Sequence, residues 1–157
     1  MSAHSVASNV NTILRTGLIA GTLDILSAIT VYALIMGKAT PVQILQGVAS
    51  GVFGREAFAG GVTMALTGLL FHYAIALIFT TVYFLLYPHL SFLHRQWVVS
   101  GVLFGVLVWL VMNLAVLPLS HFQQAPLRWA PALLGMAIII VMIGLPIAFN
   151  VQKYYRY

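Results

Sequence analysis

The sequence contains no cysteine, and only two of its residues are acidic, Asp24 and Glu56. The absence of thiols excludes disulfides, thiolate metal sites and thiol redox chemistry. Charged residues make up only 6% of the 157 residues, whereas a soluble domain carries roughly a quarter. A water-facing surface would need more charge than this, so lipid must solvate most of the chain.

Hydrophobic residues, in contrast, make up 62% of the chain, and the mean hydropathy is +1.04. Length and hydropathy together leave room for about four membrane-spanning helices and for no separate soluble domain. We therefore predict an all-α integral membrane protein with a single membrane domain over residues 1–157. Its transmembrane helices are predicted at about 13–36, 57–87, 97–117 and 131–151.

A shorter segment separates the first two predicted spans. Residues 41–50, PVQILQGVAS, follow Thr40, which can cap a helix, and begin with a proline, which is favoured in a first turn. The segment is too short to span a bilayer and mixes apolar with polar side chains. This pattern predicts one short interfacial helix.

Basic residues outnumber acidic ones, which gives a net charge of +5. They are scattered singly at the ends of apolar runs and form no basic face, so nucleic acid is not expected as a partner. The predicted partners are the lipid bilayer and either further copies of this chain or another membrane subunit.

The distribution of the basic residues also predicts an orientation. The side that holds both termini carries Arg15, Arg95, Lys153 and Arg156, and the other side carries Lys38, Arg55 and Arg128. Because basic residues are enriched on the cytoplasmic side, this small excess predicts that both termini are cytoplasmic.

One acidic residue, Asp24, lies in the middle of the apolar run from Gly17 to Met36. A carboxylate at that depth costs about 2.5 to 3.5 kcal/mol on insertion scales, so we expect it to be hidden, paired or used. Along their helices, Asp24 lies about 16 Å from Ile13 and His72 about 22 Å from Tyr87, on the same side of the membrane. A hydrogen bond between Asp24 and His72 would lower the cost of both and form a proton-accepting pair.

Two interpretations of these polar residues stay open. In the first, the chain is a small oligomeric channel or transporter for ions or small solutes, and Asp24, His72, Tyr73 and Asn113 line its path. In the second, the chain is a structural or accessory membrane subunit whose polar residues only specify helix packing. A water-accessible cavity at Asp24 and His72 favours the first interpretation, and a dry, paired Asp24 favours the second.

Two glycine pairs predict close helix packing. Gly17 with Gly21, and Gly101 with Gly105, are each four residues apart in a predicted span, so each pair shares one helix face. Such faces let two helix backbones approach closely. If they are exposed, they offer contacts between subunits.

The sequence shows no catalytic or cofactor pattern. It lacks a nucleophile elbow, an HExxH motif, paired carboxylates and a phosphate loop, so we favour a role other than that of an enzyme. His4, His89 and His94 are expected on one side, His121 on the other, and His72 alone within a span. A single central histidine cannot form a bis-histidine haem site, and no carboxylate accompanies the others. We predict no cofactor and no metal site.

The stretch from Gly68 to Leu119 includes His72 early in a helix, a helix that ends at Pro88, and the run GVLFGVLVWLVMNLAVLPL. Together with GLIAG in the first span, it resembles the uncharacterised bacterial inner-membrane proteins of the YagU-like type. The resemblance touches about half of the chain and rests on packing glycines, one histidine and a terminal proline. It implies a small multi-helix protein of the bacterial cytoplasmic (inner) membrane and supplies no mechanism.

Overall fold

The computed structural model describes residues 6–122 and 129–156, apart from the side chain of Arg95. Every secondary-structure element within these residues is helical, and four helices are long and apolar enough to cross a membrane. The predicted all-helical fold with four long apolar helices is therefore confirmed. His4 and Arg128, which entered the predictions above, lie outside the described residues.

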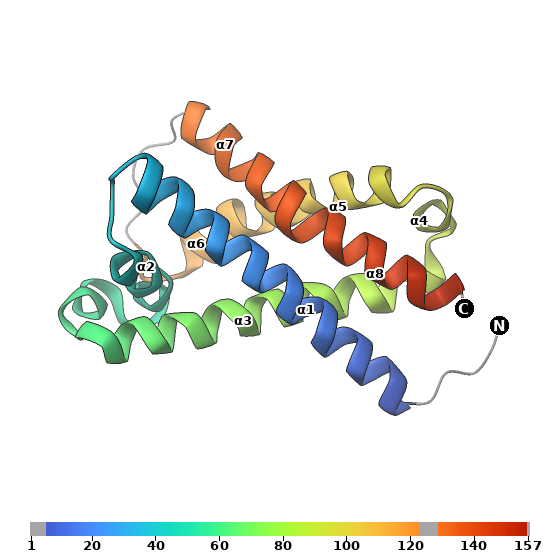
Figure 1. Cartoon of the computed structure of the whole chain (residues 1–157), viewed down its shortest axis with the longest axis horizontal. Helices are drawn as coiled ribbons and strands as arrows, with labels where there is room; N and C mark the ends of the chain where they lie inside the picture. The colour runs from blue at the N-terminus through green and yellow to red at the C-terminus, as the bar shows by residue number, and fades with distance from the viewer. Residues whose placement is uncertain (1–5, 123–128, 157) are drawn as a thin grey trace.

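The long helices change helix type along their length. The first comprises α1 (Val6–Ala28) and a π-helical segment, η1 (Ile29–Ile35), and the second comprises α3 (Gly61–Leu86) and a 3-10 turn, η3 (Tyr87–His89). The third comprises α5 (Trp97–Val111), the π-helical η4 (Met112–Val116) and α6 (Leu117–Leu119), and a short helix, α4 (Ser91–Arg95), precedes it. The fourth comprises α7 (Trp129–Ile139), the π-helical η5 (Ile140–Gly144) and α8 (Leu145–Arg156). In Figure 1, α1 and the α7–α8 helix cross α3 obliquely.

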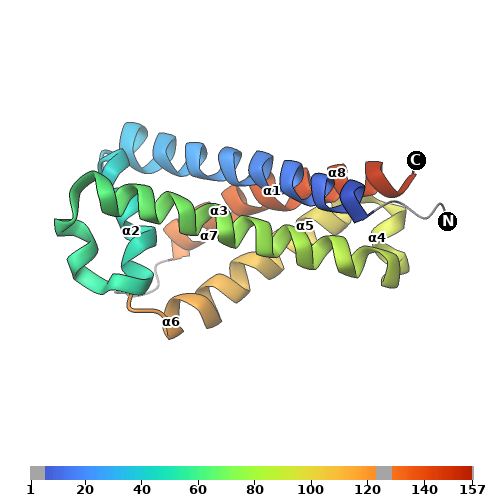
Figure 2. The ribbon, with the colours of Figure 1, turned by 90° about the horizontal axis from the view of Figure 1, so that it is seen from below.

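A short helix, α2 (Pro41–Phe53), connects the first two long helices. Thr40 caps it: the Thr40 hydroxyl accepts from the N–H of Gln43 at 3.2 Å, and the Gln43 side chain accepts from the N–H of Thr40 at 2.9 Å. Figure 2 shows α2 running across the long axis of the bundle, at the end away from the termini. It packs so closely on α3 that a Cβ at Gly68 would overlap the carbonyl of Leu45.

The second long helix begins later than predicted. A 3-10 turn, η2 (Gly54–Ala59), follows α2, and α3 begins at Gly61 rather than near residue 57. Gly54 and Gly61 have φ values of +62° and +56°, in the left-handed region that favours glycine. These two residues redirect the chain from α2 into α3.

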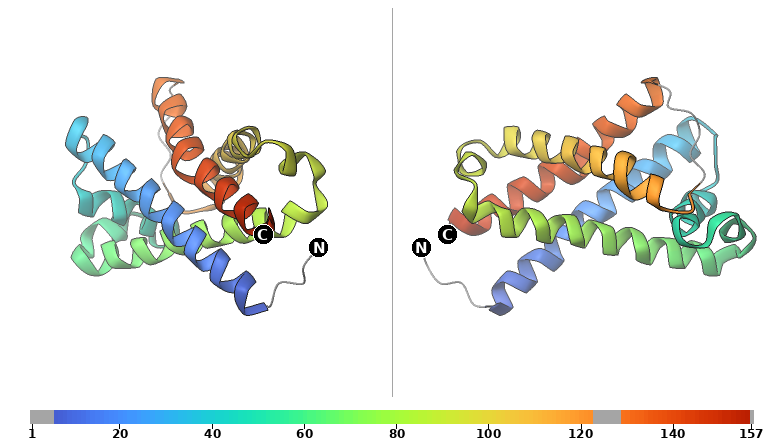
Figure 3. Two further views of the ribbon diagram at one scale, coloured as in Figure 1. Left: turned by 45° about the vertical axis from the view of Figure 1, so that its right-hand side comes forward. Right: turned by 180° about the vertical axis from the view of Figure 1, so that it is seen from behind.

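The first and fourth long helices begin earlier than predicted. α1 is helical from Val6, before the predicted start at 13, and α7 is helical from Trp129, before the predicted start at 131. The first turns of α1 pack on the end of α8, where the hydroxyl of Tyr154 donates to Oδ1 of Asn9. This tertiary contact supports the additional turns and holds the beginning of α1 and the end of α8 at one end of the molecule (Figure 3).

Proline accounts for two of the π-helical segments. η4 ends just before Pro118, and η5 ends just before Pro146. Proline has no N–H to donate, and its ring displaces the carbonyl one turn earlier. A wider turn accommodates both effects, so the sequence itself determines where these two helices widen.

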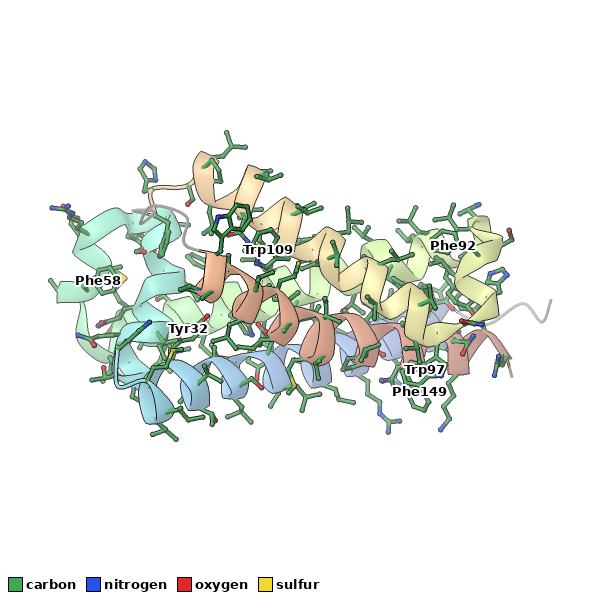
Figure 4. The ribbon with its side chains drawn as sticks, turned by 90° about the horizontal axis from the view of Figure 1, so that it is seen from above. Tyr32, Phe58, Phe92, Trp97, Trp109 and Phe149 are labelled. Carbon is green, nitrogen blue, oxygen red and sulfur yellow. The ribbon has the colours of Figure 1, made fainter. Side chains whose placement is uncertain are left out.

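The buried core lies at the end that holds the termini. The hydroxyl of Tyr83 donates to Oγ of Ser100 at 3.0 Å, and the Tyr83 ring meets Phe104 edge-on at 4.7 Å. Figure 4 shows Trp97 and Phe149 at the same end, with ring centroids 5.3 Å apart. The rest of the core consists of Ala20, Phe84, Tyr87, Leu93, Val108, Ile143, Ile147, Ala148 and Val151.

Both glycine pairs pack inside the chain. A Cβ at Gly17 would lie 2.6 Å from a methyl carbon of Leu77 on α3, and a Cβ at Gly105 would lie 2.6 Å from the backbone of η5. Gly21 and Gly101 face α3 and the η5–α8 junction in the same way. The suggestion that these faces lie exposed for contacts between subunits is therefore wrong, because α1 uses one face to pack on α3 and α5 uses the other to pack on η5.

Candidate functional site

The site begins at the place where α1 crosses α3. At Gly21, a Cβ would lie 3.0 Å from Cδ1 of Tyr73 and 3.1 Å from Cβ of Ala76, so glycine lets the two helices approach closely here. The absence of a side chain also leaves the Gly21 carbonyl open to α3. Asp24 follows one turn later on α1 and therefore shares this face of the helix.

His72 of α3 binds the Gly21 carbonyl, with 2.8 Å between Nε2 and the oxygen. A carbonyl oxygen only accepts hydrogen bonds, so Nε2 carries the hydrogen and Nδ1 of the neutral ring keeps a lone pair. No group in residues 6–122 or 129–156 is bonded to Nδ1. The ring is thus held at one nitrogen and is able to accept a proton at the other.

The carboxylate of Asp24 has no hydrogen-bond or ion-pair partner among the described residues. Within the same residues, however, no buried side-chain oxygen or nitrogen lacks a partner, so the Asp24 oxygens must reach open space. His72 and Tyr32 lie within electrostatic range of this carboxylate. Figure 4 shows Tyr32 toward the α2 end of the bundle. The sequence left open whether Asp24 and His72 pair directly. Among the described residues they form no hydrogen bond with each other, and Nε2 of His72 binds the Gly21 carbonyl instead.

The open space is a cavity of about 120 Å³ that both Asp24 and His72 line. The other lining residues described are apolar and come from α2 and from the second, third and fourth long helices: Val48, Ile75, Ala76, Phe79, Val108, Met112, Ile139 and Ile143. One water needs roughly 10 to 15 Å³ of such space, so the cavity has room for several. A carboxylate and an imidazole therefore line one small cavity whose other described walls are apolar and which is large enough for water.

Tyr73 and Asn113, the other two predicted site residues, are not brought to this cavity. The hydroxyls of Tyr73 and Thr22 are 2.8 Å apart, which joins α3 to α1 beside the site. The Asn113 amide donates to the Trp109 carbonyl at 2.8 Å, within its own helix. Sequence spacing placed these residues in the right helices but did not fix the direction of their side chains.

A larger hollow, which the sequence did not predict, lies between α2, α3 and the end of the third long helix. We call it the α2 groove; its volume is about 640 Å³. Among the described residues, its lining is apolar except for Gln43 and Ser120. The other lining residues are Ile44, Gly47, Val48, Gly51, Val52, Phe58, Phe71, Ala74, Ile75, Met112, Val116, Leu117 and Phe122. Figure 2 shows α6 diverging from α3 on this side, with α2 between them.

α2 holds the groove open because it is tied to both of its walls. Gly68 lets α2 pack directly on α3, and the backbone N–H of His121, just after α6, donates to the Gly51 carbonyl of α2 at 2.9 Å. The only sequence signal for this hollow is the small residues on facing helices, Gly47 and Gly51 on α2 and Ala74 on α3. Small side chains there fill little of the space between the helices.

The remaining described histidines lie outside this site. His94 is bonded through Nε2 to the Tyr87 carbonyl at 2.7 Å, at the end that holds the termini, and His89 and His121 are exposed. Over the described residues, no group of three or more histidine, aspartate, glutamate or cysteine side chains is placed to hold a metal ion.

No family model, curated protein or solved structure matched this chain in comparisons of its sequence and its fold.

Proposed function

We propose that this chain is an integral membrane protein in which Asp24 and His72 form an intramembrane site for a proton or a small cation. The four long apolar helices cross the bilayer, and α2 lies at the interface opposite the termini. The observation that carries the proposal is the Asp24 carboxylate: it has no partner among the described residues and shares a cavity of about 120 Å³ with His72. An ionisable group kept at such a depth is a candidate for an ion pathway.

The geometry suggests how a proton would be held. Nε2–H of His72 donates to the Gly21 carbonyl, so the neutral ring offers Nδ1 as its proton acceptor. A proton on Nδ1 turns the ring into a cation that lines the same cavity as the Asp24 carboxylate. Asp24 and His72 together can therefore hold one proton in either of two places, and water in the cavity can connect them.

The proposal includes a location and an assembly. It places the protein in a bacterial cytoplasmic membrane with both termini in the cytoplasm, in keeping with the basic residues near the termini and with the resemblance to the YagU-like proteins. One copy encloses little space, so a channel or transporter of this size would work as an oligomer or beside another membrane subunit.

A structural or accessory subunit is the second candidate function. Three hydrogen bonds favour it, because each pairs a polar side chain with a neighbouring helix or with the backbone of its own helix. They join His72 to Gly21, Tyr73 to Thr22, and Asn113 to Trp109. In this case the polar residues specify how the helices pack, and Asp24 carries no ion.

Proton flux into vesicles separates the two functions. The protein is reconstituted into liposomes that contain a pH-sensitive dye, and a membrane potential is imposed with potassium and valinomycin. We expect wild-type vesicles to acidify faster than protein-free vesicles and Asp24→Asn vesicles to match the protein-free rate, because the amide cannot ionise. The matched control is Thr81→Val on α3, whose hydroxyl bonds only the Leu77 carbonyl of its own helix, and we expect it to conduct like wild type.

Circular dichroism and gel filtration in detergent establish that each variant is folded. A wild-type rate equal to that of protein-free vesicles would overturn the proposed function. A folded Asp24→Asn variant with the wild-type rate would remove Asp24 from the pathway and favour the structural subunit.

A further inference from the structure

The α2 groove and the Asp24–His72 cavity are neighbours. Three side chains, Val48, Ile75 and Met112, line both, so they form the partition between the two spaces. None of the described residues that line the groove is charged, whereas the cavity just beyond the partition contains Asp24 and His72. The apolar α2 groove thus lies next to the cavity that contains the ionisable residues Asp24 and His72.

Met112 is the most adaptable part of this partition. It is the first residue of η4, the π-helical segment that Pro118 imposes on the third long helix. Methionine has an unbranched, flexible side chain that adjusts to irregular spaces, and π-helical turns give the backbone a locally wider geometry. A rotation of the Met112 side chain would alter this partition at one of its three residues without displacing a helix.

The polar groups of the cavity define the chemistry of a ligand. The Asp24 oxygens and Nδ1 of neutral His72 are acceptors without partners in the described residues, and the cavity lining contains no lysine or arginine. A primary ammonium carries three N–H donors and a positive charge, so it satisfies both acceptors and neutralises the carboxylate. A carboxylic acid or an amide would bring less charge complementarity, and a quaternary ammonium has no hydrogen to donate.

The size and the apolar lining of the α2 groove indicate what the remainder of the ligand is like. Its volume of about 640 Å³ lies in the range of small-molecule sites, roughly 300 to 1,000 Å³. Rings of Phe58, Phe71 and Phe122 line it, and aromatic side chains pack well against another aromatic or aliphatic body. Figure 4 shows Phe58 at this end of the bundle.

We propose that the α2 groove binds the apolar body of a primary amine whose ammonium passes Met112 and pairs with Asp24 and His72. This inference rests on the proposed function, since it names an amine as the solute class of the same ionisable site. The bound ammonium replaces the proton that Asp24 and His72 otherwise hold, so the amine and the proton compete for one site.

Binding of two molecules of the same shape tests the inference. The probes are 4-phenylbutylamine and 4-phenylbutan-1-ol, titrated calorimetrically at neutral pH into the full chain in nanodiscs, with empty nanodiscs as the reference for partition into lipid. We expect the amine to bind about tenfold more tightly than the alcohol or better, because hydrogen bonds to a charged group are the stronger ones. Asp24→Asn should abolish this preference and leave the alcohol affinity unchanged.

Groove residues provide the second arm of the test. Ala74→Leu places a larger side chain in the groove on α3 and should weaken both probes, whereas Ala137→Leu, the same change at an exposed position on α7, should weaken neither. Gly47→Leu fills the groove from α2, where a Cβ meets no atom within 4 Å, and should repeat the effect if Ala74→Leu fails to fold.

Equal affinity of wild type for amine and alcohol would overturn the inference, and so would unchanged binding in the folded Ala74→Leu and Gly47→Leu variants. The vesicle experiment keeps the two proposals distinguishable. Proton flux without amine preference would contradict only the inference, and amine preference without proton flux would contradict only the proposed proton pathway.

Discussion

The two ends of the bundle differ in how fully the helices fill the space between them. At the end with the termini, which we call the terminal half, rings and branched side chains such as Tyr83, Phe84, Phe104 and Ile147 form a buried core. At the other end, the α2 half, the same long helices leave the α2 groove of about 640 Å³. Val108 and Ile143 belong to the core and also line the Asp24 cavity, so the ionisable site lies at the boundary between the halves.

The two halves therefore differ in what holds their helices in place. The terminal half makes the contacts that hold the long helices together, including the bond from Tyr154 of α8 to Asn9 of α1. The α2 half is held open by a short helix rather than filled by side chains. The polar site at the boundary therefore has the packed core on one side and the apolar α2 groove on the other.

The largest expected effect is in the terminal half. Ile147 is 0% exposed, so Ile147→Ala should lower the free energy of unfolding by about 2 to 5 kcal/mol through lost contacts and a new cavity. Denaturation by SDS in mixed micelles, followed by circular dichroism, measures the loss. Ile78→Ala is the matched control, because Ile78 is 60% exposed on α3 and should change stability little. Equal losses in the two variants would mean that the terminal half is not the stable half.

The next effect lies where α2 meets α3. In Gly68→Ala the new methyl group would overlap the Leu45 carbonyl, so we expect a loss of about 1 to 3 kcal/mol and displacement of α2. The displacement can be followed by maleimide labelling of Ala49→Cys, because the chain has no other cysteine and residue 49 of α2 is 0% exposed. We expect this cysteine to react faster with maleimide when Gly68→Ala is also present. Gly135→Ala on α7, whose Cβ would have its nearest neighbours at 3.8 Å, should not lower stability and should leave labelling unchanged.

A smaller effect is expected from one hydrogen bond of the core. Tyr83→Phe removes the hydroxyl that donates to Ser100, which should cost about 0.5 to 1.5 kcal/mol. Tyr155→Phe should cost less, since that hydroxyl is 3.4 Å from the Phe84 carbonyl, a long distance for this kind of bond. A double-mutant cycle between Tyr83→Phe and Ser100→Ala isolates the interaction, and additive losses would show that the two groups do not interact.

The smallest effect should have the opposite sign. Gly47 is in the middle of α2 and a Cβ there meets no atom within 4 Å, so Gly47→Ala should raise stability by about 0.5 to 1 kcal/mol through helix propensity alone. The same SDS denaturation detects the gain. Destabilisation by this variant would show that the α2 half is more closely packed than its groove indicates.

The sequence predicted the helix count well because a long apolar run is a strong signal and needs no tertiary information. Helix boundaries were less predictable, because contacts between distant residues decide them. Asn9 is an example: its side chain is bound by Tyr154, more than a hundred residues later, and α1 is helical around it. Gly54 and Gly61 are a second example, since their positive φ values, known only from the structure, separate η2 from α3.

The candidate site was predictable in part. The cost of a carboxylate inside an apolar span singled out Asp24, and helix geometry placed His72 at a similar depth. The actual partner of His72, the Gly21 carbonyl, is a backbone group that a close helix crossing exposes, and sequence patterns do not reveal it. The α2 groove was missed because a hollow depends on how far helices diverge, and composition alone does not determine that distance.

The π-helical segments have a consequence for chain length. A π turn contains one residue more than the α turn it replaces, so deletion of a residue within η4 or η5 can restore an α turn and leave later side chains on their original face. α3 is α-helical from Gly61 to Leu86, and a deletion there would rotate every later side chain by about 100° around the helix axis. The helix that carries His72 therefore tolerates no such deletion, whereas the third and fourth long helices can each lose a residue at their π-helical segments.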